Sequence, residues 1–251
     1  MVTLLLKKSY LHKDLKEVKF NDLWNAYGVF TTMRVLGKSA KILFYKSHIN
    51  NLIYSLKKYK IYKKNLKKII YNLVNINLKK NKNYDHLLRI AFNKKIISIS
   101  LRKRPLPKND FRLKMVNYKR VEAKYKNLKY KKILNLLNKL DTRKFDIALY
   151  KNKKLLESGT SNILLVMNNT IYSPKRDIYK GITYKFFKKK TKIIEKDIFL
   201  KKLLKYDEII LIGSGKGVVS VAKIENTSWK RKSLKIYHRL FKTYNNAIIN
   251  S

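Results

Sequence analysis

The stretch Glu157-Ser158-Gly159-Thr160-Ser161-Asn162-Ile163 sets one acidic residue beside a turn of small residues. The runs on either side, 154–157 and 161–167, are short and largely apolar and are predicted as strands joined by this turn. The chain has only 15 Asp and Glu residues among 251. An acid at the end of a predicted strand is therefore a candidate for a chemical role.

The glycines are few and are gathered in a small number of segments. Six of the seven lie around Gly28, Gly159, Gly181 and the run 213–217. Glycine allows positive φ and close approach of the backbone to a ligand. The pattern predicts loops that cradle a ligand, although ordinary turn glycines would give the same pattern.

Four segments together indicate one kind of chemistry. A lysine amine, here Lys124, can form a Schiff base with a carbonyl cofactor. Pyridoxal 5'-phosphate needs such a lysine, a carboxylate at its pyridine nitrogen, for which Glu157 is suited, and a cup for its phosphate. Gly181-Ile182-Thr183 can supply the cup, because free N–H groups at a helix start bind phosphate. Gly213-Ser214-Gly215 is a second candidate cup, so the sequence predicts pyridoxal 5'-phosphate as the cofactor.

The charge of the chain allows a different interpretation. The formal net charge of +46 is typical of nucleic-acid-binding proteins, but 51 of the 61 basic residues are lysines, spread over nearly every segment. Readers of bases and phosphates favour arginine. We therefore expect no specific nucleic-acid partner, and a basic nucleic-acid-binding protein is kept as an alternative.

Missing and scattered residue types exclude other chemistries. The chain has no cysteine, and its four histidines show no metal-ligand spacing, so no metal site is expected. No apolar run approaches eighteen residues, and the one at the N-terminus is too short for a signal peptide. We expect no membrane span and a cytoplasmic location.

Apolar periodicity predicts a mixture of helices and short strands. Helices are expected after Ser47 as the N-cap, and over 66–74, 129–140, 183–190 and 233–247. Strands are expected at 87–92 and 96–101, which form a hairpin, and at 145–150, 170–173, 208–212 and 218–224. Pro105 and Pro107 mark the best candidate for a domain boundary, within 102–116.

These segments resemble the class IV aminotransferase family, the fold-type IV pyridoxal-phosphate enzymes, in order along nearly the whole chain. Residues 28–35 are similar to the opening strand of the family, 47–52 to its first helix, and 122–127 to the segment with its Schiff-base lysine. Glu157 follows Lys124 by 33 residues, as the family spacing suggests.

The resemblance implies an α+β fold of two domains, like that of D-amino acid aminotransferase, with the cofactor between the domains. It implies an N-terminal α/β domain over 1–110, an interdomain linker over 111–118 and a C-terminal pseudo-barrel domain over 119–251. It also implies a homodimer and a small-molecule amine as substrate.

Roles for single residues follow from the same resemblance. Lys124 is the expected catalytic residue. The expected cofactor-binding residues are Glu157, Ile182, Thr183, Ser214 and Asn51, and the expected substrate-binding residues are Thr31, Arg34 and Arg89.

Three positions depart from the family pattern. Asn51 stands where the family usually has an arginine to the cofactor phosphate, and Tyr184 replaces the basic residue usual after Gly-Ile-Thr. Leu164 replaces an aromatic residue. A degenerate member with weaker cofactor binding is therefore a further alternative.

Two classes of reaction stay open. Residues 30–35, Phe-Thr-Thr-Met-Arg-Val, are most similar to the 4-amino-4-deoxychorismate lyases, which eliminate pyruvate and leave 4-aminobenzoate for folate synthesis. Lys129 stands where branched-chain aminotransferases have a tyrosine. The lyase is the favoured interpretation, and an aminotransferase acting on branched-chain or D-amino acids is the alternative.

Overall fold

The computed structural model describes residues 3–79 and 82–250, and the chain divides into two compact units. Unit 1 consists of Met1–Arg104 with Tyr125–Lys131, and unit 2 consists of Pro105–Lys124 with Lys132–Ser251. The fold is a mixed α/β one in which the described parts of both units are built on β-sheets.

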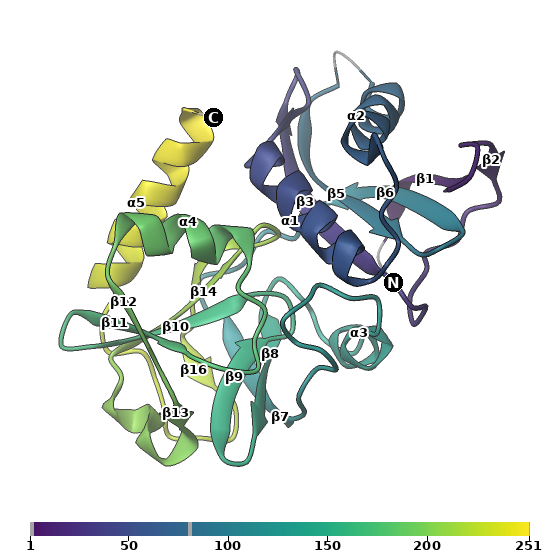
Figure 1. The fold of residues 1–251 in the computed structure, drawn as a ribbon. Helices are drawn as coiled ribbons and strands as arrows, with labels where there is room; N and C mark the ends of the chain where they lie inside the picture. The colour runs from purple at the N-terminus through teal and green to yellow at the C-terminus, as the bar shows by residue number, and fades with distance from the viewer. Residues whose placement is uncertain (1–2, 80–81, 251) are drawn as a thin grey trace. The chain divides into compact units, whose positions relative to one another are not determined.

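Unit 1 carries, among its described residues, one antiparallel sheet of six strands in the order β2-β1-β6-β5-β3-β4. Helices α1 and α2 cover one face of this sheet, and their apolar residues share a core with β3, β5 and β6 (Figure 1). The elements are β1 (Leu4–Leu11), β2 (Glu17–Val18), β3 (Val29–Gly37), β4 (Lys41–Ile42), α1 (Tyr45–Lys58), α2 (Leu66–Asn77), β5 (Tyr84–Phe92) and β6 (Ile96–Lys103).

The two faces of β3 have different surroundings. Val29, Met33 and Val35 belong to the core that the helices share. Phe30, the residue after Val29, packs instead with Leu128 in a second, smaller apolar cluster. Because side chains alternate along a strand, the odd-numbered residues of 29–37 face the helices and the even-numbered residues face the other side of the sheet.

Unit 2 contains two five-stranded sheets within its described residues, with the orders β12-β11-β10-β14-β15 and β13-β9-β8-β7-β16. Apolar residues of both sheets contribute to one core. The elements are β7 (Arg112–Asn117), α3 (Lys131–Leu137), which begins with the last residue of unit 1, β8 (Phe145–Lys151), β9 (Lys154–Ser158), β10 (Asn162–Met167), β11 (Thr170–Pro174), α4 (Ile182–Lys190), β12 (Ile193–Lys196), β13 (Ile198–Phe199), η1 (Leu200–Lys205), β14 (Glu208–Gly213), β15 (Gly217–Ser220), β16 (Lys223–Ile224) and α5 (Lys235–Ile249).

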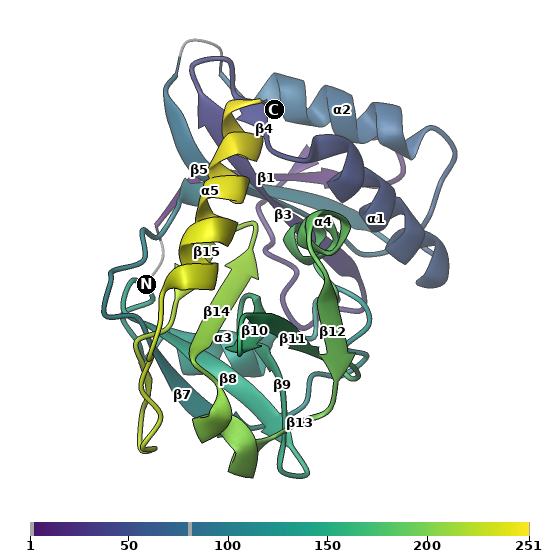
Figure 2. The ribbon, with the colours of Figure 1, turned by 90° about the vertical axis from the view of Figure 1, so that its left-hand side faces the viewer.

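Helix α5 packs along β14 and β15 (Figure 2). Its first turn is held by Glu208, a buried residue of β14. The carboxylate accepts hydrogen bonds from the backbone N–H groups of Ile236 at 2.9 Å and Tyr237 at 2.8 Å. A carboxylate at this position satisfies free N–H groups and opposes the positive end of the helix dipole.

The structure corrects the predicted organisation at two places. Helix α1 begins at Tyr45 and not after Ser47, because Phe44, with φ 56, sits in the left-handed region at the N-cap. Residues 112–117, placed in a linker by the sequence analysis, form β7, which pairs in parallel with β8 and β16. Pro105 and Pro107 lie before this strand, so they do not interrupt its hydrogen bonding.

The single strand predicted over 218–224 is wrong: the structure divides it into β15 and β16, which belong to different sheets. The other predicted helices and strands are confirmed, with ends that shift by a few residues. None of the helices in the described residues is long and apolar enough to cross a membrane.

Candidate active site

Glu157 lies near the end of β9 and is buried, with 5% of its surface exposed. One carboxylate oxygen accepts a hydrogen bond from Arg120 Nε at 2.7 Å. The other accepts one from the backbone N–H of Tyr179 at 3.2 Å. The guanidinium compensates the burial of the carboxylate charge, which fixes the side chain in one orientation.

Arg120 also connects Glu157 to the segment that carries Lys124. Its Nη2 donates to the carbonyl oxygen of Ala123 at 3.0 Å, and Ala123 directly precedes Lys124. The side chain of Lys124 is exposed, at the end of the turn 121–124. Within unit 2 the structure thus brings the backbone at Lys124 and the carboxylate of Glu157 onto the same guanidinium.

Sequence reasoning did not find Arg120. Two signals were present: the chain has only ten arginines among its 61 basic residues, and this one lies four residues before Lys124. Arginine is the residue suited to a buried ion pair, because its planar group makes several directed hydrogen bonds and keeps its charge.

Asn162, the first residue of β10, fixes the start of helix α4. Its Nδ2 donates to the carbonyl oxygen of Tyr179 at 2.6 Å, and its Oδ1 accepts from the backbone N–H of Gly181 at 3.0 Å. In the strand register Asn162 lies opposite Ile212, the residue before Gly213. The start of α4 and the turn after β14 therefore both lie beside Asn162.

The N-terminus of α4 fits a bound phosphate. Gly181 is its N-cap and makes no side-chain capping hydrogen bond. The hydroxyl of Thr183 is buried and has no hydrogen-bond partner within residues 3–79 and 82–250. An unpartnered buried donor beside free helical N–H groups is the arrangement that an anion satisfies. Ser214 lies half-exposed in the turn that joins β14 to β15.

These residues match the parts that pyridoxal 5'-phosphate requires. Unit 2 offers an exposed lysine, a buried carboxylate held by a guanidinium, and a helix start with an unpartnered hydroxyl. We conclude that the residues present fit this cofactor. Among the described residues, no group of three His, Asp or Glu side chains is arranged to hold a metal ion.

Two of the departures from the family pattern have structural roles. Leu164 is fully buried in β10. Tyr184 donates its hydroxyl to Glu195 at 2.8 Å, and burial together with this hydrogen bond raises the pKa of Tyr184. Glu195 also pairs with Lys180, just before α4, and with Lys188 in its last turn, so it fastens α4 to β12.

The predicted substrate residue Thr31 contacts a histidine of α1 on the helix side of the unit 1 sheet. Its Oγ1 lies 2.9 Å from Nδ1 of His48 on α1, and both side chains are buried. Burial, with a smaller effect of Lys126, lowers the pKa of His48 to about 3, so this histidine is neutral at neutral pH.

Arg34 is also engaged within unit 1. Its Nε donates to Asp85 at 2.9 Å, and Arg104 donates to the same carboxylate. Burial alone would raise the pKa of Asp85, but the two guanidinium groups outweigh it and lower that pKa. Asn51, on α1, accepts a hydrogen bond from the Ser55 hydroxyl at its carbonyl oxygen, 3.0 Å away.

Arg89 lies on β5 directly opposite Thr32 of β3. Its guanidinium carbon stacks 3.6 Å from the ring centre of Trp24, and Nη2 donates to the carbonyl oxygen of Asp22. Its Nε is buried with no hydrogen-bond partner in the part of the chain that the structure describes. Burial lowers the pKa of Arg89 to about 9. The group is still a cation at neutral pH and keeps one unused donor.

The comparisons with known proteins identify the family of the chain. The sequence model of the class IV amino-transferase family matches residues 28–224, which cover most of the chain. The chain therefore belongs to the class IV aminotransferase family, a family of enzymes that depend on pyridoxal 5'-phosphate. No curated protein sequence matches it significantly.

Solved structures share its fold. A branched-chain aminotransferase from Thermoproteus uzoniensis superposes with a TM-score of 0.76 at 18% identity, over 96% of this chain and 94% of that one. A protein from Legionella pneumophila assigned as a 4-amino-4-deoxychorismate lyase gives 0.71 at 19% identity, over 88% and 91%. The pyridoxal-phosphate-bound form of a hypothetical aminotransferase from Mycobacterium tuberculosis gives 0.72 at 13% identity, over 98% and 99%.

Proposed function

We propose that this enzyme is a 4-amino-4-deoxychorismate lyase, which eliminates pyruvate from its substrate and leaves 4-aminobenzoate. The observation that carries the proposal is the stretch 30–35, which resembles the lyases more closely than it resembles the aminotransferases. This stretch forms the middle of β3, where Thr32 lies beside Arg89. A structural neighbour assigned as such a lyase supports the same reading.

Lys124 is proposed to hold the cofactor and to move the proton of the reaction. When bound, pyridoxal 5'-phosphate supplies an electron sink for the charge that develops on the substrate carbon. The freed Nζ of Lys124 takes the proton from the amine-bearing carbon of the substrate. Its exposed position leaves the side chain accessible to an incoming amine.

Glu157 is proposed to bind the pyridine nitrogen, and Arg120 keeps its carboxylate in place for that contact. Ile182 and Thr183, at the start of α4, and Ser214, in the turn after β14, are proposed to bind the phosphate. Asn51 is proposed as a weaker substitute for the family arginine at the phosphate, because an amide is neutral.

Arg89 is the proposed partner of a substrate carboxylate. Its stack on Trp24 fixes the plane of the guanidinium, and its Nε keeps a donor that is buried and unused among the described residues. An aminotransferase acting on branched-chain or D-amino acids is the second candidate, supported by structural neighbours such as the Thermoproteus uzoniensis enzyme. In either reaction the substrate carries a carboxylate that Arg89 would bind.

The same proposal extends to assembly and location. We place the enzyme in the cytoplasm as a homodimer with no specific nucleic-acid partner. The roles of Thr31 and Arg34 as substrate contacts are likewise part of the proposal.

The test begins with the absorption spectrum of the purified protein after addition of pyridoxal 5'-phosphate. A near-visible band that borohydride removes is expected for the wild type and for Lys129→Ala, a nearby exposed lysine variant. Lys124→Ala should lack the band and lose turnover by at least about a thousandfold, because both covalent attachment and the proton transfer depend on this amine. A fully active Lys124→Ala enzyme would refute the mechanism.

Assays on the loaded wild type then separate the two reactions. Release of pyruvate and 4-aminobenzoate from aminodeoxychorismate would support the lyase. Formation of a 2-oxo acid from an amino-acid donor, without that release, would support the aminotransferase. A protein that forms no band with excess cofactor would be a degenerate member of the family.

A further inference from the structure

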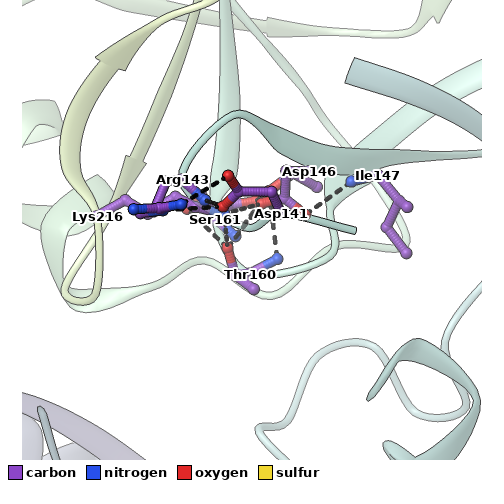
Figure 3. Close-up of polar contacts among 8 residues, drawn as sticks. Asp141, Arg143, Asp146, Ile147, Thr160, Ser161 and Lys216 are labelled. Atoms are coloured by element: carbon purple, nitrogen blue, oxygen red, sulfur yellow. Dashed lines mark hydrogen bonds and ion pairs between the residues drawn. The ribbon is translucent and has the colours of Figure 1, made fainter. Parts of the chain in front are cut away.

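A buried ion pair lies next to two of the proposed cofactor segments, the turn after Glu157 and the run 213–217. Asp146 of β8 and Lys216 of the turn after β14 pair at 2.8 Å, with 0% and 4% of their side chains exposed (Figure 3). Lys216 lies within the run 213–217, two residues after Ser214. The turn that holds Ser214 is therefore tied to β8.

The pair is part of a closed hydrogen-bond network that includes the turn 158–161. Thr160 Oγ1 donates to Asp146 at 2.7 Å and accepts from Lys216 at 3.0 Å. Ser158 Oγ donates to the same Asp146 oxygen at 3.1 Å. The backbone N–H of Ile147 donates to the other oxygen at 2.8 Å. Lys216 thereby joins the turn after Glu157 to the turn that holds Ser214.

Two glycines show how closely these segments pack. A Cβ atom added at Gly159 would lie 2.8 Å from an Asp146 carboxylate oxygen. One added at Gly213 would lie 2.9 Å from the hydroxyl oxygen of Ser161. Neither distance leaves room for a side chain, so each turn approaches its neighbour as closely as the backbone allows.

We propose that Lys216 is a positioning residue for the cofactor phosphate, which holds the turn 213–217 at a fixed place relative to the turn that follows Glu157. This inference rests on the proposed function. The charge of Lys216 is balanced by Asp146, so its contribution is the placement of Ser214 and of the backbone N–H groups of the turn, and not direct attraction of the phosphate. A phosphate cup binds only when its donors are already aimed at one point.

The experiment compares pyridoxal 5'-phosphate with pyridoxal, which lacks the phosphate, by titrating the near-visible band and fitting a dissociation constant for each. The readout is the dissociation constant of pyridoxal divided by that of pyridoxal 5'-phosphate. Attachment to Lys124 is common to both compounds and cancels in this ratio. In Lys216→Met this ratio should fall at least about tenfold, the size of one hydrogen bond to a charged group. The dissociation constant of pyridoxal itself should stay within about twofold.

Lys216→Met leaves a buried carboxylate without its cation, which destabilises the fold, so a second variant is needed. The double variant Asp146→Asn with Lys216→Met removes both charges and keeps an acceptor for Thr160 and Ser158. It should fold and show the same loss of ratio. If the double variant keeps the wild-type ratio, the proposal is overturned, because the loss in the single variant then came from an unpaired negative charge.

Glu208→Gln is the matched control. Glu208 is a buried acid on β14, the strand that leads into the same turn, but it binds the start of α5. This variant should lower the melting temperature and leave the ratio unchanged. An equal loss of ratio in Glu208→Gln would show a general loss of stability and would overturn the positioning role. A wild type that forms no band would instead refute the proposed function, and a wild type that binds both compounds equally would refute only the phosphate cup.

Discussion

The two units treat their predicted functional residues differently. In unit 2, the carbonyl group before Lys124, the carboxylate of Glu157 and the start of α4 are joined by hydrogen bonds of Arg120, Tyr179 and Asn162. In unit 1, each predicted substrate residue has its own separate partner: His48 for Thr31, Asp85 for Arg34 and Trp24 for Arg89. The proposed cofactor residues of unit 2 are therefore held in place by one connected set of hydrogen bonds. The proposed substrate residues of unit 1 each contact a partner within the protein, and a substrate would have to bind beside that partner or replace it.

One ion pair near the predicted functional residues of each unit shows a difference in burial, and so in what its loss would cost. The Arg120–Glu157 side chains in unit 2 are 4% and 7% exposed. The Arg34–Asp85 side chains in unit 1 are 13% and 42% exposed. Breaking a buried pair leaves an uncompensated charge in the interior, while an exposed carboxylate is solvated by water. The energetic consequences of substitution should separate the two units clearly.

The largest expected effect is that of Arg120→Leu. The free energy of unfolding should fall by about 3–5 kcal/mol, because the Glu157 carboxylate would stay buried without its cation. Denaturant unfolding of the wild type and the variant measures this difference. The double variant Arg120→Leu with Glu157→Gln should recover most of the loss. A loss below about 1 kcal/mol in the single variant would show that the carboxylate reaches water, and the contrast between the units would disappear.

A second, smaller effect is the loss of unfolding free energy at acidic pH that His48 causes in unit 1. Its pKa is about 3 in the folded protein, below the ordinary value of 6.5, so the unfolded chain binds a proton that the folded chain does not. The contribution of His48 to the free energy of unfolding is therefore fully present above pH 6.5 and is lost as the pH drops toward 3. Between pH 7 and pH 5 the contribution of His48 is a loss of about 2 kcal/mol.

The measurement is the free energy of unfolding at pH 7 and pH 5 for the wild type and for His48→Gln. His12 and His86, whose pKa values are also lowered mainly by burial, act in the same direction and are present in both proteins. The difference between the two proteins therefore isolates His48. The same slope in both would mean that His48 is protonated in the folded state.

Unit 2 should respond to acid at lower pH through Glu195. Burial raises its pKa, but hydrogen bonds from Lys180, Lys188 and Tyr184 outweigh this and lower it to about 2. Its contribution is present above pH 4.5 and is lost as the pH falls toward 2. Acid should thus weaken unit 1 over a higher pH range than it weakens the α4 attachment in unit 2.

Much of the fold could be predicted because its signals are local. The apolar spacing of α1 and α2, the hairpin β5–β6 and the glycine turn between β14 and β15 are each contained in a short stretch of sequence. Strand β7 was missed because Pro105 and Pro107, shortly before it, predict a domain boundary within 102–116, a range that includes most of this strand. Its apolar alternation, with Leu113 buried, was the signal that could have found it.

The connections of the site could not be predicted, because they depend on topology. Arg120 and Glu157 are 37 residues apart, and Asp146 and Lys216 are 70 apart. No spacing rule links positions so distant until the strand order is known. For the same reason, sequence reasoning could propose Thr31 and Arg34 as substrate contacts but could not see that His48 and Asp85 already hold them.

The smallest expected effect on stability is that of Arg34→Ala, and it decides whether Arg34 has a role beyond structure. Asp85 is partly exposed and keeps Arg104, so the loss of unfolding free energy should be at most about 1 kcal/mol. Arg104→Ala is the matched control, because it removes the other guanidinium from the same carboxylate. If Arg34 binds substrate, KM should rise in Arg34→Ala and stay unchanged in Arg104→Ala. Equal kinetics in the two variants would assign Arg34 to the structure of unit 1 alone, and Arg89 would then be the remaining basic candidate on that sheet.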